Sequence, residues 1–571
     1  MKSQELRKIA PEYDPLRIGM GWSIQDLEKP QVIIESTMGD SHPGSVHLMS
    51  LVNKANEGIE IKGGKGSRYY ATDICDGQAQ GHDGINYSLV SRDIIANLIE
   101  IHINATPFDA AVFISSCDKA IPAHLMAIGR LNIPSIVVTG GVMNAGPDLL
   151  TLEELGKYSA MYQRKEINLE QFTYYKQNAC PSYGACSFMG TANTMQVIAE
   201  ALGLMLPGNA LLPATSNELT KYAKEAGMQA VNLFKMDLVP SKIVTRKSIE
   251  NAIMIHAAIS GSTNAILHLP AIAHEFGIEI DGDTFDLLNK NLHYILDVRP
   301  VGKWPSEYIF YAGGVPAIME ETKHLLHLDV MTVTGKSLGE NLDILKSNGY
   351  YEKCNMYLSE KNVKKTDIIR DFKAPISSDG AIAILRGNIC PDGAVIKHTA
   401  VPIEMHKSIL TARPFDSEED ALEAILKKKI APGDAVIIRY EGPKGSGMPE
   451  MFYTTEAISS DIELSKTIAL LTDGRFSGGS KGPVIGHISP EAQEGGPIAL
   501  VEENDLIEID IKKRILRIVG IKGKKVSLEE IEKILSERKS KWKPKETKFK
   551  SGVLKLYTEN AVSPMKGGYM K

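Results

Sequence analysis

The sequence has few cysteines, no long apolar run and no excess of positive charge. Its six cysteines in 571 residues include no CxxC pair, so they do not form the disulfide framework of a small secreted domain. No uninterrupted apolar run approaches the roughly 18 residues that span a bilayer, and residues 1–7 lack the apolar core of a signal peptide. We therefore expect a cytoplasmic protein with reduced thiols and no membrane partner.

The charge balance and the size narrow the class further. A formal net charge of −6 gives no electrostatic reason to bind nucleic acid or an anionic membrane surface. The hydrophobic content of 43% is ordinary for a globular protein. A chain of 571 residues exceeds the size at which one hydrophobic core keeps growing, so at least two domains are expected.

The hydrophobic pattern differs between the two halves of the chain. Helical periodicity over 92–103 precedes an apolar run over 110–116, and a helical segment over 124–130 precedes a second run over 133–141. This alternation of strand and helix predicts a parallel sheet. After about residue 360, short Val/Ile runs alternate with Gly/Pro turns, which is typical of a barrel. We predict an α/β fold, with a parallel-sheet α/β domain over 1–365 followed by a β-barrel-like domain over 366–571.

The run Cys117-Asp118-Lys119 stands where the predicted strand 110–116 ends. Ligands bind at the carboxyl ends of strands in open α/β sheets. A soft thiol beside a hard carboxylate suggests two different metals side by side. Lys119 would repel a divalent cation unless carbamylation converted it into an oxygen ligand. The alternative is a simple surface ion pair between Lys119 and Asp118.

Two further cysteines lie in Gly-rich segments. Cys75 precedes Asp76, repeating the pair at residues 117 and 118, and Cys186 precedes the segment 187–194. Three thiolates with one open position suit a [4Fe–4S] cluster, and the paired carboxylates suit Mg²⁺. The alternative is that these thiols only pack, because cysteine is among the most buried residue types.

Two Gly-rich turns of the second half also carry reactive side chains. The first, 441–450, ends in Glu450, and the second, 471–480, contains Ser477. Neither has the spacing of a phosphate-binding P-loop. Such turns usually serve only the backbone, but here they could present a carboxylate and a hydroxyl to a ligand.

Taken together, these segments resemble the family of dihydroxy-acid and sugar-acid dehydratases, which includes phosphogluconate dehydratase. The matching runs keep the family's order over nearly the whole chain: 75–77, 81–84, 117–119, 186–194, 261–264, 312–316, 447–450 and 472–479. The resemblance implies a homodimer or homotetramer, an Fe–S cluster on Cys117 and Cys186, and Ser477 as the catalytic base. It also implies Mg²⁺ binding by Asp76, Asp118, a carbamylated Lys119 and Glu450.

One departure bears on the cluster. Some members carry a cluster cysteine in a Pro-Cys-Asn turn, which reads Pro43-Gly44-Ser45 here. Cys75 instead matches a cysteine of the phosphogluconate dehydratase-like members. The resemblance therefore favours a [4Fe–4S] cluster on Cys75, Cys117 and Cys186 over a [2Fe–2S] cluster.

The expected activity is that of a hydro-lyase. The segment 186–194 looks closer to the sugar-acid branch, so the first expectation is dehydration of an aldonate to a 2-keto-3-deoxy acid. The second is dihydroxy-acid dehydration in valine and isoleucine synthesis. An electron-transfer Fe–S protein would explain the thiols but not the three carboxylates and Ser477.

Overall fold

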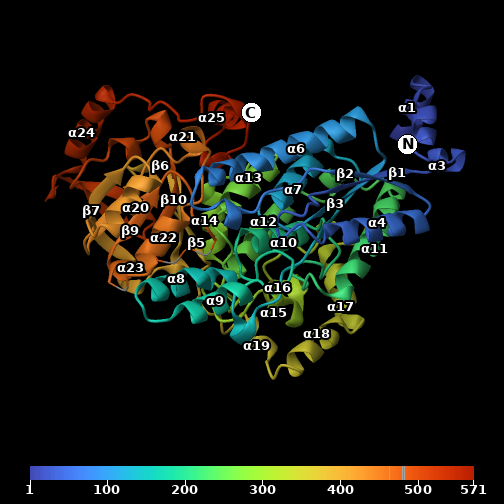
Figure 1. The fold of residues 1–571 in the computed structure, drawn as a ribbon, viewed down its shortest axis with the longest axis horizontal. Coiled ribbons are helices and arrows are strands. Elements are labelled where there is room, and N and C mark those ends of the chain that lie inside the picture. The colour runs from blue at the N-terminus through green and yellow to red at the C-terminus, as the bar shows by residue number, and fades with distance from the viewer. Residues whose placement is uncertain (462, 479, 481) are drawn as a thin grey trace.

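The computed structural model describes residues 1–571 except 462, 479 and 481 (Figure 1). Gly479, the last residue of the run 472–479, therefore lies outside the described residues. The chain forms an N-terminal α/β part with a parallel sheet and a C-terminal closed barrel of eight strands, which confirms the predicted fold class. The division at residues 365 and 366 stays a prediction.

The N-terminal sheet is formed by four parallel strands in the order β2-β1-β3-β4. Three of them are buried along their whole length, as expected when helices cover both faces of a parallel sheet. The strands are β1 (Gln31–Ser36), β2 (Lys65–Tyr70), β3 (Ala110–Ser115) and β4 (Ser135–Thr139).

Helices pack on this sheet in pairs (Figure 1). Helix α4 (Leu48–Ile61) lies against α11 (Asn217–Lys235), and α6 (Tyr87–Ala105) lies against α7 (Ala120–Leu131). The helices predicted over 92–103 and 124–130 are therefore α6 and α7, each slightly longer than its periodic core. Helix α6 connects β2 to β3, and α7 connects β3 to β4, as in βαβ units. The parallel strands β2 and β3 therefore end at the same edge of the sheet.

The barrel follows the order β11-β7-β8-β9-β10-β6-β5-β12, and β11 pairs with β12 to close it. Alternate side chains of its strands fill the interior, including Ile396, Ile437 and Leu471. Closure removes the sheet edges that would otherwise invite pairing with another chain. The strands are β5 (Ile382–Gly387), β6 (Cys390–Lys397), β7 (Lys407–Phe415), β8 (Asp434–Ile438), β9 (Ala469–Thr472), β10 (Val484–Ser489), β11 (Leu506–Asp510) and β12 (Ile515–Ile521), with β13 (Lys524–Lys525) appended to β12.

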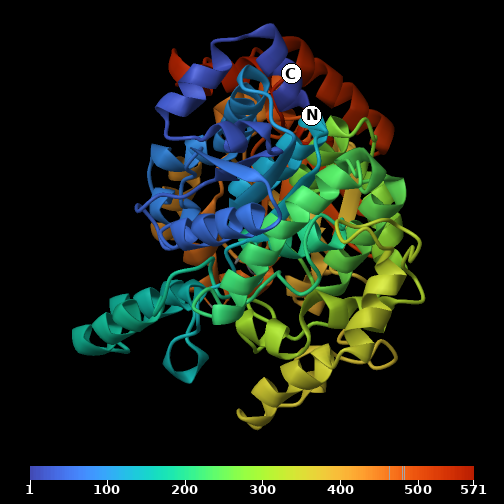
Figure 2. The ribbon, with the colours of Figure 1, turned by 90° about the vertical axis from the view of Figure 1, so that its right-hand side faces the viewer.

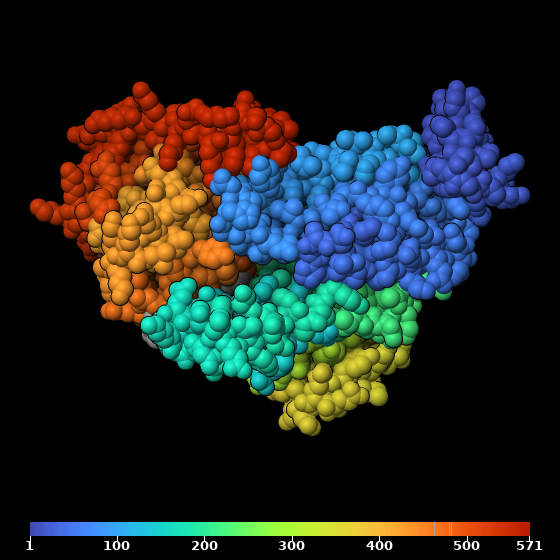
Figure 3. Space-filling model, in the orientation of Figure 1, coloured from blue at the N-terminus to red at the C-terminus, as the bar shows by residue number. Residues whose placement is uncertain are grey.

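A projecting arm was not anticipated from the sequence. Its helices α8 (Leu155–Gln163) and α9 (Leu169–Asn178) bury no residue of their own, and Figure 2 shows them extending away from the body. The rings of Tyr158 and Tyr175 stack with centroids 3.6 Å apart and hold the two helices together. In the space-filling view the arm lies beneath the junction of the α/β part and the barrel (Figure 3).

The C-terminal segment ties the barrel back to the α/β part. Helix α25 (Gly552–Asn560) places Leu554 and Tyr557 against Leu89 of α6, and Met565 joins the core of the α/β part. Among the described helices, none is long and apolar enough to cross a membrane.

Candidate active site

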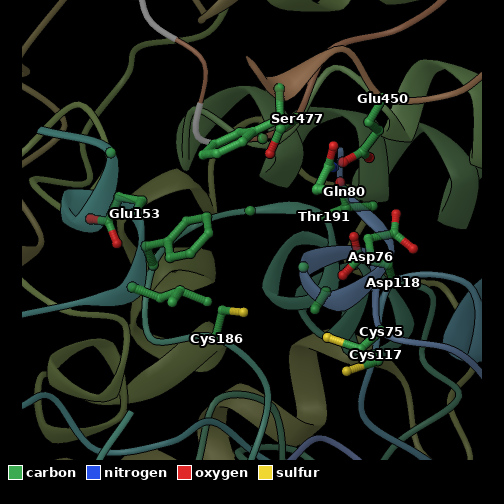
Figure 4. Close-up of a pocket in the computed structure, with 18 of the residues that line it drawn as sticks. Cys75, Asp76, Gln80, Cys117, Asp118, Glu153, Cys186, Thr191, Glu450 and Ser477 are labelled. Carbon is green, nitrogen blue, oxygen red and sulfur yellow. The ribbon is translucent and has the colours of Figure 1, made fainter. Parts of the chain in front are cut away.

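Seven of the eight predicted site residues line a single cavity of about 200 Å³ (Figure 4). The eighth, Lys119, is buried beside it. The seven are Cys75, Asp76, Cys117, Asp118, Cys186, Glu450 and Ser477. The cavity therefore brings together residues that lie up to about 400 positions apart in the chain.

The four site residues Cys75, Asp76, Cys117 and Asp118 follow the carboxyl ends of two strands of the parallel sheet. The chain leaves β2 shortly before Cys75 and leaves β3 directly before Cys117, and β1 lies between these two parallel strands. Their carboxyl ends consequently share one edge of the sheet, where ligands of open α/β sheets bind. Asp76 begins the short helix α5 (Asp76–Ala79), and Lys119 directly precedes α7.

The remaining residues come from loops of other elements. Cys186 lies in the loop before α10 (Thr191–Ala201), while Glu450 and Ser477 come from loops of the barrel. An isolated parallel bridge between Glu450 and Arg475 joins the two barrel loops. The site is therefore built at the junction of the two domains, a common location for ligand cavities.

The three thiols lie at one end of the cavity. Figure 4 shows the sulfur atoms of Cys75 and Cys186 pointing toward one another, with Cys117 beside Cys75. None of the three is in a disulfide. Burial raises the pKa of the Cys75 thiol to about 11 and raises the pKa values of Cys117 and Cys186 well above the ordinary value for a thiol. The thiols are therefore neutral in an empty site, and a bound metal cation would be needed to hold them as thiolates.

The turn at Gly44 touches this thiol cluster. A Cβ at residue 44 would lie 2.2 Å from Cys117 Sγ, so a side chain there would enter the cluster. The nearby His42 ring bonds Asp73 Oδ1 through Nε2 (2.9 Å) and accepts the Gly44 N–H at Nδ1 (3.2 Å). This His42–Asp73 pair could not be predicted from the sequence, because its members lie 31 positions apart.

The carboxylates of Asp76, Asp118 and Glu450 converge at the other end. One oxygen from each lies within 4.8 Å of the other two. Oxygen ligands about 2.1 Å from a central Mg²⁺ stand roughly 3.0–4.2 Å from one another, so the three oxygens lie near the spacing that a single ion requires. Burial raises the pKa of Glu450 to about 7 and raises that of Asp118. Burial also acts to raise the pKa of Asp76, but the charges of Lys119 and Arg475 lower it overall.

Lys119 is not the surface residue that the alternative interpretation required. Its side chain is fully buried, with the amine 2.8 Å from Asp76 Oδ2 and 3.7 Å from Asp118 Oδ2. In this unmodified form it stands within the carboxylate group as a counter-charge. The surface ion-pair interpretation is therefore wrong.

Arg475 and Asn264 orient Glu450, and neither was predicted as a site residue. Arg475 donates to Glu450 Oε1 (2.5 Å), the Met448 carbonyl (2.7 Å) and Ser88 Oγ (2.9 Å). Asn264 donates to the same Glu450 oxygen (2.6 Å). Ser88 in turn donates to Asp76 at 2.8 Å. Both Arg475 and Asn264 belong to runs quoted for the family resemblance, but their partner is visible only once the two domains meet.

The wall of the cavity is mainly apolar. The arm and the segment before it contribute Leu152 and Leu155, and other elements contribute Ile74, Phe188 and Phe452. Polar exceptions in this wall are Gln80, Glu153, Thr191 and Tyr453. No lysine or arginine is among the lining residues that the structure describes. The arm's contribution could not be read from the sequence, since its helices are largely exposed.

Comparison with known proteins agrees with this architecture. The family model "Dihydroxy-acid/6-phosphogluconate dehydratase N-terminal" matches residues 29–341, and its C-terminal counterpart matches residues 367–568. A protein of Caldanaerobacter subterraneus subsp. tengcongensis named "Dihydroxy-acid dehydratase" is 43% identical, with 100% of this chain and 99% of that protein covered. "Dihydroxy-acid dehydratase 1" of Methanosarcina acetivorans is 43% identical over 96% of both chains.

A further relative, the "Dihydroxy-acid dehydratase" of Solidesulfovibrio magneticus, is 44% identical over 88% of both chains. These names favour the second of the two expected activities over the aldonate dehydratase that we placed first. The chain belongs to the dihydroxy-acid/6-phosphogluconate dehydratase family.

Proposed function

We propose that this protein is a dihydroxy-acid dehydratase, which removes water from a 2,3-dihydroxy carboxylate bearing a short branched alkyl group. The observation that carries this proposal is the apolar wall of the cavity, formed by Leu152, Leu155, Phe188 and Phe452. The names of the full-length relatives support the same choice.

The energetic argument rests on hydroxyl groups. An aldonate carries additional hydroxyls beyond carbon 3, and each must find a partner when water is excluded. A buried hydroxyl left without a hydrogen bond costs about 1–3 kcal/mol, which is roughly a 5- to 150-fold loss of affinity. Branched methyl groups instead gain about 0.8 kcal/mol each when buried against apolar side chains. Apart from the thiols, the three carboxylates and Ser477, the polar side chains among the described lining residues are Gln80, Glu153, Thr191 and Tyr453.

Two cofactors complete the proposal. Cys75, Cys117 and Cys186 would hold a [4Fe–4S] cluster, with a [2Fe–2S] cluster as the alternative. Asp76, Asp118, Glu450 and a carbamylated Lys119 would hold Mg²⁺. When bound, these groups would supply Lewis-acid polarisation of the leaving hydroxyl and charge stabilisation for the enolate. Carbamylation of Lys119 would replace an ammonium that opposes the cation with an anionic oxygen ligand.

The protein's own residues would then perform the proton chemistry. Ser477 would take the proton from C2, the C2=C3 double bond would form, and the C3 hydroxyl would leave. The resulting enol would gain a proton at C3 and lose its hydroxyl proton, giving a 2-keto acid and water. Asn264 and Arg475 would keep Glu450 in position throughout, and the apolar wall would exclude bulk water from the enol.

Anaerobic purification with cluster reconstitution, followed by a 2-keto-acid assay, tests this proposal. We expect product from 2,3-dihydroxy-3-methylbutanoate and loss of product when Mg²⁺ is removed with a chelator. Product only from gluconate or galactonate would support the aldonate activity instead. Reversible cluster reduction without any keto-acid product would support an electron-transfer protein and refute the proposal.

A further inference from the structure

Ser477 lies between two cavities. It lines the large cavity that holds the thiols and carboxylates, and it also lines a second one of about 20 Å³. The second cavity, here called the inner chamber, is bounded by apolar and glycine residues and by the polar residues Ser262, Thr263, Lys397, Ser477, Ser480 and His487. A volume of about 10–15 Å³ is enough for one water molecule if polar partners surround it. The inner chamber meets both conditions.

His487 is aimed into this region by its backbone. The pairing of β10 with β6 shifts register between Gly486 and Ser489, and His487 has φ of +56°. A β-bulge re-aims a side chain, and a left-handed backbone at a residue other than glycine is kept only where the surroundings impose it. The His487 N–H donates to the Gly474 carbonyl at 2.8 Å, which ties the bulge to the loop that carries Ser477.

The imidazole of His487 has unused hydrogen-bonding capacity. It is 1% exposed, and neither ring nitrogen has a partner among the described residues. Buried polar atoms of this kind are usually satisfied, commonly by an ordered water. Burial and the nearby Arg475 charge lower the pKa of His487 to about 3, so the ring is neutral and can accept one hydrogen bond and donate another.

Lys397, at the end of β6, faces the same chamber. Its amine donates to the Ser260 carbonyl at 2.7 Å, and in the described part of the chain no neighbouring carboxylate contributes to the shift of its pKa. A buried ammonium without a counter-charge is costly, and burial lowers the pKa of Lys397 to about 8. The neutral amine, which is the form that can accept a proton, is therefore the minor form at pH 7 and the major form above that pKa. The other titratable groups that influence the pair are His256 near Lys397, and Arg475 and His268 near His487.

We propose that Lys397, assisted by His487 and one water in the inner chamber, accepts the proton that Ser477 must lose before it can act as a base. This inference rests on the proposed dehydratase function. In the transfer the Ser477 O–H bond breaks, the water gains one proton as it gives up another, and an N–H bond forms on Lys397. The amine becomes an ammonium and Ser477 an alkoxide, and no electrons are exchanged.

This assignment explains how an ordinary serine becomes a base. A serine hydroxyl is too weak a base at neutral pH, and activated serines depend on an adjacent acceptor or a metal. After it takes the C2 proton, Ser477 can return a proton to C3 of the enol and so regain the alkoxide state. The proton on Lys397 is then retained from one turnover to the next. Lys397 and His487 are positioning residues, since they act on the substrate only through Ser477.

The test uses the reconstituted holoenzyme and three variants. We expect Lys397→Met to lower kcat by about 10²-fold or more, the usual contribution of a proton-transfer group. Methylamine added to this variant should restore part of the rate, and larger amines should not. Lys397→Arg, which stays protonated and so cannot accept the Ser477 proton, should lose activity and resist rescue. Lys407→Met, which removes an exposed lysine of β7, is the matched control and should behave as wild type.

Two observations would overturn the inference. One is an unchanged kcat and pH profile in Lys397→Arg or Lys397→Met with normal cluster absorbance. The other is a crystal structure of the holoenzyme in which the inner chamber is dry, because the inference requires one water within about 3.2 Å of both Ser477 and Lys397. Failure of the wild-type enzyme to form keto acid from any dihydroxy acid would instead refute the proposed function.

Discussion

Replacement of Arg475 by methionine gives the most quantitative prediction. The guanidinium is fully buried and bonds Glu450, the Met448 carbonyl and Ser88, and it lies 4.0 Å from Asp76. It therefore offsets part of the negative charge of the carboxylate group and joins the barrel to α6. Removing one partner of a buried ion pair costs about 3–5 kcal/mol, because the other charge stays buried without compensation.

Urea unfolding followed by circular dichroism measures this cost. The urea slope grows with chain size and should be at least about 3 kcal/mol per molar here, so the Arg475→Met midpoint should fall by several tenths of a molar and by at most about 1.7 M. The control is Arg386→Met, whose partner Asp283 is 71% exposed. A surface pair of this kind is worth only about 0–1 kcal/mol, so the control midpoint should barely move. Equal midpoints for the two variants would refute the view that Arg475 stabilises the carboxylate group.

Three further predictions concern the site and the sheet. Ser477→Ala should lower turnover by at least about 10²-fold, with the cluster absorbance and bound iron unchanged. Cys186→Ser should lose iron in reconstitution, whereas Cys180→Ser, an exposed cysteine that does not line the cavity, should retain it. Burial raises the pKa of Glu35 from 4.5 to about 8, so stability should fall as pH rises across this range, by at most about 1.4 kcal/mol per pH unit. Glu35→Gln should flatten that fall, and an unchanged pH profile would contradict the assignment.

The sequence alone predicted which strand ends carry the candidate site residues. The apolar run 110–116 predicted a buried strand, and β3 occupies Ala110–Ser115 with Cys117 just beyond its end. Parallel strands share an edge, so the pairs at residues 75–76 and 117–118 had to lie close together. The convergence of Asp76, Asp118 and Glu450 follows from the same pattern together with the family resemblance.

The roles of Arg475, Asn264 and the arm could not be predicted from the sequence, because they depend on contacts between distant elements. The role of Arg475 requires the barrel to dock on α6, and that of Asn264 requires a partner 186 positions away. The arm shows little hydrophobic periodicity because it buries almost nothing, yet the chain around it provides Leu152 and Leu155 to the cavity wall. The segment 186–194 alone favoured an aldonate as substrate, because the apolar cavity wall is not visible in the sequence.

The central claim is that the apolar wall selects a branched dihydroxy acid, and the ratio of two kcat/KM values tests it most directly. The measurement compares 2,3-dihydroxy-3-methylbutanoate with gluconate on the same reconstituted, Mg²⁺-loaded enzyme under anaerobic conditions. With about 1–3 kcal/mol lost for each unpaired hydroxyl, the dihydroxy acid should be preferred by at least about 10-fold. A ratio at or below one would contradict the account.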